Sequence, residues 1–278
     1  MKIEQIAVRS EFLQRYVDFY YLLSTAKCVE NTAYLAFPSP RTPLGFLNNA
    51  SISRTPDKVR VDFSPNGPLE ASIVGNFLKP LEVNFEPGID EFAITFKPLG
   101  VNFFSPQNLG DILGEKVEQT SIFDKLLPSA QKMIRGVDAI DELESVLLSQ
   151  FASNKQLEIL ESAIEIFEVS TNQVSEQQIS KKLDISGKQL FRLFKNHLGV
   201  NPTQYRQLLR FRNTLDLITK TLQPQTLTEI GLSAGYYDQP HFIREFKSIT
   251  DLAPREFLRK ISLEANDKIV WQFLSENV

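Results

Sequence analysis

Apolar residues recur at helical spacing in the stretch 179–205, about two thirds of the way along the chain. Ser186 is a good N-cap for a helix in this stretch, and Gly199 is a good C-terminal stop. The spacing between them therefore predicts a short amphipathic helix. Its apolar face consists of Leu190, Leu193, Phe194 and Leu198, and its opposite face of Lys188, Phe191, Arg192 and Lys195.

The same pattern returns 52 residues further on, in the stretch 230–257. The upstream isoleucines Ile179 and Ile230 are offset by only 51, so one residue was gained near Gly235. Two unrelated amphipathic helices would share core spacing but not basic residues on the outward face, and we interpret both copies as helix-turn-helix units. The matched pairs are Ser186 and Asp238, Leu190 and Phe242, Phe191 and Ile243, Arg192 and Arg244, Phe194 and Phe246, Lys195 and Lys247, Pro202 and Pro254, and Tyr205 and Phe257.

A long segment, 202–221, joins the two copies. Pro202 suits the first turn of a helix. The apolar positions of the segment predict one rigid rod that holds both units, so that the two recognition helices enter the major groove about one turn, or ~34 Å, apart. A shorter separation would require bent DNA, at a cost of roughly 1–6 kcal/mol.

The N-terminal half has a β texture from 33 to 104. Short runs rich in Val, Ile and Phe alternate with turns rich in Pro, Gly and Asn, which is typical of an antiparallel sandwich or barrel. The stretch 12–23 is either a strand or a buried helix, because periodicity does not decide it. Many of the 21 phenylalanines lie in this half, so the sheet encloses either a plain core or a small apolar ligand cavity. The β runs are TAYLAF, KVRVDF, ASIVGNF, LEVNF and EFAITF.

After Pro106 the pattern becomes helical. It predicts a helix over 121–136 that Pro128 interrupts, followed by amphipathic helices over 138–153 and 155–170. The fold class is therefore α+β, with a β-rich sandwich or barrel-like N-terminal domain and an all-α C-terminal domain. The predicted boundaries are 1–170 for the regulatory domain, 171–262 for the double helix-turn-helix domain and 263–278 for a C-terminal extension.

Charge supports this division. Residues 1–174 carry a net charge of −8, residues 175–262 carry +6 and residues 263–278 carry −2. A basic module on an acidic body is the electrostatic pattern of a nucleic-acid-binding protein. The composition also predicts no membrane span, no secretory signal and no zinc site, and the single cysteine, Cys28, suits a reducing cytoplasm.

Residues 175–260 resemble the DNA-binding domain of the AraC family of bacterial transcription regulators. The sequence departs from the family pattern at Gly231, Pro240 and Asp251, the last of which stands where the family usually has glycine. Residues 35–105 resemble more loosely a β-rich N-terminal domain of some members, not the arabinose-binding cupin. The C-terminal resemblance is carried by Ser186, Leu190, Arg192, Phe194, Lys195, Gly199, Pro202, Tyr205 and Arg210, and by Ile230, Gly235, Tyr236, Asp238, His241, Phe242, Arg244, Phe246, Lys247 and Pro254.

Side-chain chemistry predicts how these residues contact DNA. Arg192 and Arg244 can each bond a guanine, although a phosphate contact or a surface ion pair is the alternative. Phe191 and Ile243 can meet thymine methyl groups or pack between helices. The helix N-termini at the two caps bind phosphate. Gln239 suits adenine, Lys188 suits a base or a phosphate, and Lys195 and Lys247 suit the phosphate backbone. His241 could cap the helix, contact DNA or be half-buried, with a non-ligand role favoured, and His197 is expected to be structural. The candidate DNA-binding residues are Ser186, Lys188, Gln189, Phe191, Arg192, Lys195, Asp238, Gln239, His241, Ile243, Arg244 and Lys247.

The sequence therefore predicts a sequence-specific, double-stranded-DNA-binding transcription regulator without a cofactor or metal. The resemblance implies an activator that recruits RNA polymerase, senses a signal such as a small-molecule effector with its N-terminal half, and can form a homodimer. One alternative is control by a protein partner. A remote alternative is an enzyme that accepts alkyl groups from DNA on Cys28, which has no histidine or metal cluster beside it in the sequence.

Overall fold

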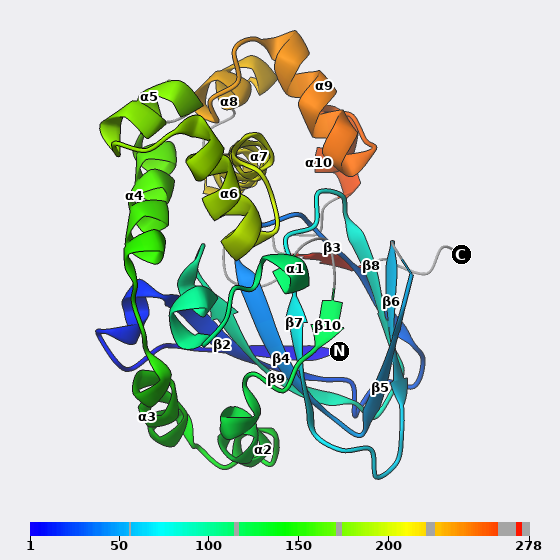
Figure 1. Ribbon diagram of the computed structural model, residues 1–278. Coiled ribbons are helices and arrows are strands. Elements are labelled where there is room, and N and C mark those ends of the chain that lie inside the picture. The colour runs from blue at the N-terminus through cyan, green and yellow to red at the C-terminus, as the bar shows by residue number, and fades with distance from the viewer. Residues whose placement is uncertain (56, 114–116, 171–173, 221–225, 261–270, 274–278) are drawn as a thin grey trace.

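The computed structural model describes all residues except 56, 114–116, 171–173, 221–225, 261–270 and 274–278. Two β-sheets form the body of the molecule, and a group of helices lies against one end of it (Figure 1). The predicted α+β class is confirmed. Within the described residues, no helix is both long and apolar enough to span a membrane.

The larger sheet has six strands in the order β1-β2-β9-β4-β7-β10, and the smaller has five in the order β11-β3-β8-β6-β5. The five predicted β runs form β3, β6, β7, β8 and β9. The ambiguous stretch 12–23 forms a short 3-10 helix followed by β2. The strands are β1 Lys2–Ile6, β2 Val17–Ser24, β3 Thr32–Ala36, β4 Thr42–Asn48, β5 Ala50–Arg54, β6 Lys58–Phe63, β7 Glu70–Val74, β8 Leu81–Phe85, β9 Asp90–Phe96, β10 Val117–Gln119 and β11 Trp271–Phe273.

The antiparallel prediction is wrong for one pair, because β6 and β8 run parallel, with Val59 opposite Val83. The reason is topological. The intervening strand β7 belongs to the larger sheet, so the chain leaves the smaller sheet after β6 and re-enters it in the same direction. At the other edge of the smaller sheet, β11 from the predicted C-terminal extension pairs with β3, so this part of the extension belongs to the body.

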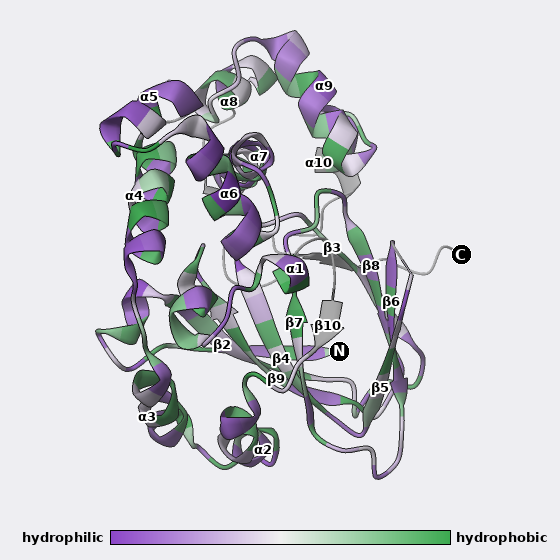
Figure 2. Ribbon diagram, viewed as in Figure 1, coloured by the Kyte–Doolittle hydropathy of each residue, from purple (hydrophilic) through white to green (hydrophobic). Residues whose placement is uncertain are grey.

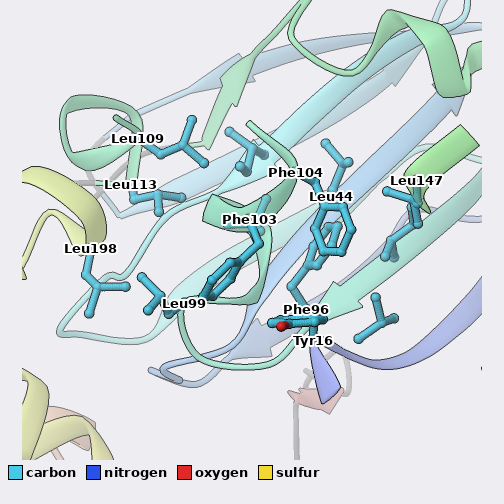
Figure 3. Packing of buried hydrophobic residues seen from close by; sticks show 14 of the residues in the cluster. Tyr16, Leu44, Phe96, Leu99, Phe103, Phe104, Leu109, Leu113, Leu147 and Leu198 are labelled. Carbon is cyan, nitrogen blue, oxygen red and sulfur yellow. The ribbon is translucent and has the colours of Figure 1, made fainter. Parts of the chain in front are cut away.

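Alternation along β9 separates two cores. Phe92, Ile94 and Phe96 belong to the core that the larger sheet shares with the helices. Figure 3 shows Phe96 in this core. Glu91 and Thr95 point the other way, into the space between the two sheets. Because successive side chains of a strand alternate between its faces, one strand serves both layers.

The helices of the N-terminal half pack on the larger sheet. The interruption predicted at Pro128 is wrong, because α2 begins at Leu127 and places Pro128 in its first turn, where a missing N–H breaks no helical bond. The 3-10 helices are Leu13–Arg15, Gly100–Phe104 and Asp124–Leu126, and the α-helices are α1 Gly110–Leu113, α2 Leu127–Ile134, α3 Ile140–Gln150 and α4 Lys155–Val169.

Six further α-helices follow within 176–260. Hydrophilic residues dominate α5 and the visible side of α6 (Figure 2). Helix α4 also packs here, since the ring of Phe167 meets those of Phe194 and Tyr205 at centroid distances of 5.7 and 6.2 Å. The helices are α5 Glu176–Lys182, α6 Gly187–Leu198, α7 Pro202–Lys220, α8 Leu227–Ser233, α9 Gln239–Thr250 and α10 Pro254–Lys260.

Candidate nucleic-acid interface

Helix α6 is the predicted first recognition helix, and both of its ends form as the sequence indicates. The hydroxyl of Ser186 accepts a hydrogen bond from the backbone N–H of Gln189 at 3.1 Å. Gly199 ends the helix in the left-handed region, with φ of 70°. The Lys195 ammonium donates to the carbonyl of Gly199 at 3.0 Å, which places this cation at the C-terminal end of the helix.

The two faces of α6 also separate as predicted. Leu190 and Phe194 are buried in the core, while the side chains of Lys188, Arg192 and Lys195 are exposed. Phe191 lies between Lys188 and Arg192 on this face and is 47% exposed, which is unusual for a large apolar side chain. This face, Lys188, Phe191, Arg192 and Lys195, is hereafter the α6 basic face.

Helix α9 repeats this construction. The Asp238 carboxylate accepts from the backbone N–H of His241 at 2.7 Å and caps the helix. At the other end Asp251 adopts φ of 57°, so the aspartate takes a left-handed conformation that favours glycine. Gln239, Arg244 and Lys247 are exposed and form the α9 basic face.

Two candidates on α9 have contacts within the protein. Ile243 is half-buried and packs against the apolar core of the second unit, which favours the helix-packing alternative over a thymine contact. The His241 Nδ1 accepts from the Tyr237 backbone N–H at 3.3 Å, and its Nε2 lies 3.4 Å from the Glu245 carboxylate. These contacts give His241 a place in the local framework of α9.

Helix α7 is the rod that joins the two units. Tyr205 and Leu209 belong to the core that contains α6, and Phe211 and Leu215 belong to the core that contains α9. Since one continuous helix contributes to both cores, its rigidity fixes the first basic face relative to the second.

A buried ion pair adds to this connection. The Arg210 Nε on α7 donates to the Glu245 carboxylate on α9 at 2.8 Å, and both side chains are about nine-tenths buried. The Arg210 guanidinium also lies 5.4 Å from the centre of the Tyr236 ring. Sequence reasoning missed Glu245 because the 52-residue repeat matches it with Leu193, an ordinary core position.

Both units contact the β-body, the first through backbone carbonyls at the C-terminal end of α6 and the second through an aromatic side chain. A side chain at Gly110 of α1 would approach the carbonyl oxygen of Lys195 to 2.1 Å, so only glycine allows α1 this close to the end of α6. The Asn76 side-chain amide donates to the carbonyl of Leu198 at 2.8 Å. In the second unit, the ring of Phe37 meets that of Phe257 at 5.1 Å.

Tyr237 is a further candidate that the sequence pattern did not single out. It lies directly before the cap Asp238, and its side chain is 86% exposed. Two consecutive tyrosines before the cap were the signal in the sequence that could have identified it. Tyr236 is buried in the core, which leaves Tyr237 on the surface.

The remote alternative, alkyl transfer to Cys28, would require a general base beside the thiol, and neither histidine lies there. Cys28 is half-buried in the body, and both histidines lie in the C-terminal helices. A hydrogen bond with the N-terminal amine lowers the pKa of the thiol, and the Thr32 hydroxyl at 3.6 Å contributes further. Within the described part of the chain, no cluster of three or more His, Cys, Asp and Glu side chains can hold a metal ion.

Two capped, basic-faced helices on a shared rod define a protein with a double helix-turn-helix module. A helix-turn-helix domain family model matches residues 179–260. The regulator ArgR of Pseudomonas aeruginosa is 32% identical over 79 residues, which are 28% of this chain and 23% of that protein. The arabinose operon regulatory protein of Escherichia coli is 28% identical over 92 residues, which are 33% of this chain and 31% of that protein.

Among solved structures, ToxT of Vibrio cholerae aligns over 86% of this chain and 96% of its own, with 14% identity and a TM-score of 0.46. The sequence matches to the two regulators cover only about a quarter to a third of their lengths. The C-terminal module of this chain belongs to the AraC type of helix-turn-helix domain, as its residues indicated.

Proposed function

We propose that the protein is a sequence-specific transcription regulator, an activator that recruits RNA polymerase when its N-terminal half has sensed a signal. The observation that carries the proposal is the exposure of two basic faces, on α6 and α9, whose helices share the rod α7. A cation on an exposed helix face attracts phosphate, and a guanidinium there can reach two acceptors on a guanine edge.

In this mechanism α6 and α9 enter adjacent segments of the major groove of one duplex. Arg192 and Arg244 read bases, and Lys188 and Lys247 contact base or backbone. The N-terminal amides after Ser186 and Asp238 bind phosphate through the positive end of each helix dipole. Genome-wide mapping of bound sites tests the proposal, because two-part sites upstream of promoters are expected and random occupancy would contradict it.

Arg192→Ala is expected to weaken binding to a mapped site by about 1–3 kcal/mol while changing the affinity for random DNA much less. The reason is that a bidentate contact to guanine discriminates between bases, whereas a phosphate contact does not. Titration of both duplexes by fluorescence anisotropy measures the difference. Arg135→Ala, which removes the exposed arginine at the C-cap of α2 in the body, is the matched control. An equal loss on both duplexes would remove the base-reading role of Arg192.

Lys247→Ala is expected to reduce the slope of log K against log salt concentration by about 0.9, which is the release of one counterion. Its side chain is exposed on the α9 basic face, where a phosphate contact needs no rearrangement. Lys27→Ala, an exposed lysine of the body, is the control and is expected to leave the slope unchanged. An unchanged slope for Lys247→Ala would exclude this residue from the phosphate contacts.

A further inference from the structure

The two sheets of the body enclose a cavity of about 120 Å³. Its walls are the facing sides of strands from both sheets, and most of the lining side chains are aliphatic or aromatic, among them Phe19, Tyr34, Val61 and Phe85. A dry cavity on the order of 150 Å³ in another protein takes up benzene. The space therefore suits a ligand built around one ring.

One carboxyl group interrupts this apolar surface. Glu91 on β9 lines the cavity and is only 7% exposed. The Tyr21 hydroxyl lies 3.3 Å from its Oε1 atom. Within the described part of the chain, no lysine or arginine forms an ion pair with Glu91, and burial raises the pKa of its carboxyl to about 7.

The neighbouring strand is built to admit this carboxyl. Gly45 on β4 lies beside it, and a Cβ atom at Gly45 would fall 2.3 Å from the Glu91 Oε1. A plain apolar core would place a larger residue at position 45 and an apolar one at position 91. The absence of a side chain at Gly45 thus leaves room for a buried acid that lacks a cationic partner among the described residues.

We propose that this cavity binds a small apolar organic cation, such as a protonated aryl-alkyl amine, with the Glu91 carboxylate as its counter-charge. Phe19, Tyr21 and Tyr34 line the same space, and the negative quadrupole at the face of an aromatic ring attracts a cation. Arg41 also lines the cavity, but its Nε donates to the Asp18 carboxylate at 2.7 Å, so its charge already has a partner.

The cavity has a direct route to the second helix-turn-helix unit. Phe37 lines the cavity and also belongs to the core of that unit, where its ring lies 6.3 Å from that of Phe211 and 5.1 Å from that of Phe257. A ligand that displaces the Phe37 ring changes the packing beneath α7 and α10. This regulatory step rests on the proposed function, whereas binding in the cavity does not.

Isothermal titration calorimetry of the full chain tests the binding with three probes that share one ring and differ in charge: 2-phenylethylammonium, 2-phenylethanol and 3-phenylpropanoate. The cation is expected to bind at least about tenfold more tightly than the anion, as a charge-assisted hydrogen bond of 1.5 kcal/mol or more requires. Tighter binding of the anion would assign the cavity to Arg41 and overturn the proposal, as would a failure of all three probes to bind.

Glu91→Gln keeps the shape of the side chain and removes its charge. It is expected to weaken binding of the cation about tenfold and to leave binding of the alcohol unchanged. Glu4→Gln, the same substitution at an exposed position of β1 outside the cavity lining, is the matched control and is expected to leave binding of the cation unchanged. Equal affinity of the cation for wild type and Glu91→Gln would overturn the role of Glu91.

A second measurement needs no variant. In the wild type, binding of the cation is expected to be on the order of tenfold weaker at pH 5.5 than at pH 8, because the carboxyl is then mostly protonated. The other ionisable groups that line the cavity are Arg41, Tyr21 and Tyr34. Burial raises the pKa of both tyrosines, so they stay neutral throughout. A pH-independent affinity for the cation would contradict the proposal.

The same protein then separates this proposal from the proposed function. DNA affinity is measured with and without 2-phenylethylammonium. Binding of the cation without binding of DNA would contradict the function alone, and binding of DNA without binding of the cation would contradict the ligand proposal alone. If Phe37 couples the cavity to the second unit, the cation is expected to change the DNA affinity of the wild type. Phe37→Leu is expected to bind the cation but to show no such change in DNA affinity. The same change in DNA affinity in Phe37→Leu as in the wild type would overturn the coupling route.

Discussion

Arg210→Ala is expected to destabilise the C-terminal helices by about 3–5 kcal/mol and to reduce affinity for a two-part DNA site to that of a single unit. The substitution leaves the Glu245 carboxylate buried, with its side chain 8% exposed, and without its guanidinium partner. An unpaired buried charge is far more costly than the pair it came from. The His241 Nε2 atom, at 3.4 Å, remains beside the carboxylate.

The control for this prediction is the double variant with Arg210→Met and Glu245→Met. Replacing both charges by apolar side chains of similar size is expected to change stability by less than about 1 kcal/mol or to increase it. Urea unfolding followed by circular dichroism measures the single and the double variant together. If both lose the same stability, the loss arises from side-chain packing and the buried charge is not its cause.

DNA binding by the double variant distinguishes the two interactions that hold α9 on α7, which are the buried ion pair and the apolar core. Phe211 and Leu215 of α7 still pack against α9 when the charges are gone. If the apolar core alone fixes α9 on the rod, the double variant binds a two-part site as tightly as the wild type. Weakened binding at full stability would show that the ion pair sets the orientation of the second recognition helix.

The two recognition helices could be predicted from sequence because their signals are local. Ser186 and Asp238 cap the N-termini, Gly199 ends the first helix, and the apolar spacing between these points has a helical period. Each signal involves residues within four positions of one another, so it does not depend on how the rest of the chain folds. Even Asp251, where glycine was expected, adopts the left-handed conformation that the helix end requires.

The parallel pairing of β6 with β8 could not be predicted, since it depends on which sheet receives the intervening strand β7. Glu245 was missed for a related reason. The repeat aligns it with the core position Leu193, but its partner Arg210 is 35 residues away and no local pattern links the two. A partner that is distant in sequence can determine the role of a charged residue, and the local sequence pattern does not reveal it.

The cavity shows the same limit. A small apolar cavity was one of two predicted possibilities for the interior of the β-body, the other being a plain core, but the pattern gave no reason to place a carboxyl inside it. Glu91 alternates with Phe92 and reads as an ordinary polar position on an outward face. Only the second sheet, whose edge strand β11 comes from the far end of the chain, makes that face an interior one.

Glu91→Gln is expected to stabilise the protein by about 3 kcal/mol at pH 8 and to have no such effect at pH 4. In the wild type, burial raises the pKa of the carboxyl from its ordinary 4.5 to about 7. Between these values the folded state holds a proton that the unfolded state has lost, so stability falls as the pH rises through this window. Each pKa unit corresponds to about 1.4 kcal/mol, and the loss is complete above pH 7.

Glutamine cannot titrate, so the variant does not suffer this loss. The quantity to measure is the difference in free energy of unfolding between variant and wild type, from urea titrations at pH steps from 4 to 8, because groups that titrate in both proteins cancel in that difference. The difference is expected to rise with pH and to level off above pH 7. A flat difference would mean that the Glu91 carboxyl stays ionised in the folded protein, and hence that water or a counter-ion reaches it in the cavity. Adding 2-phenylethylammonium at pH 8 is expected to stabilise the wild type more than the variant, which binds the cation about tenfold more weakly.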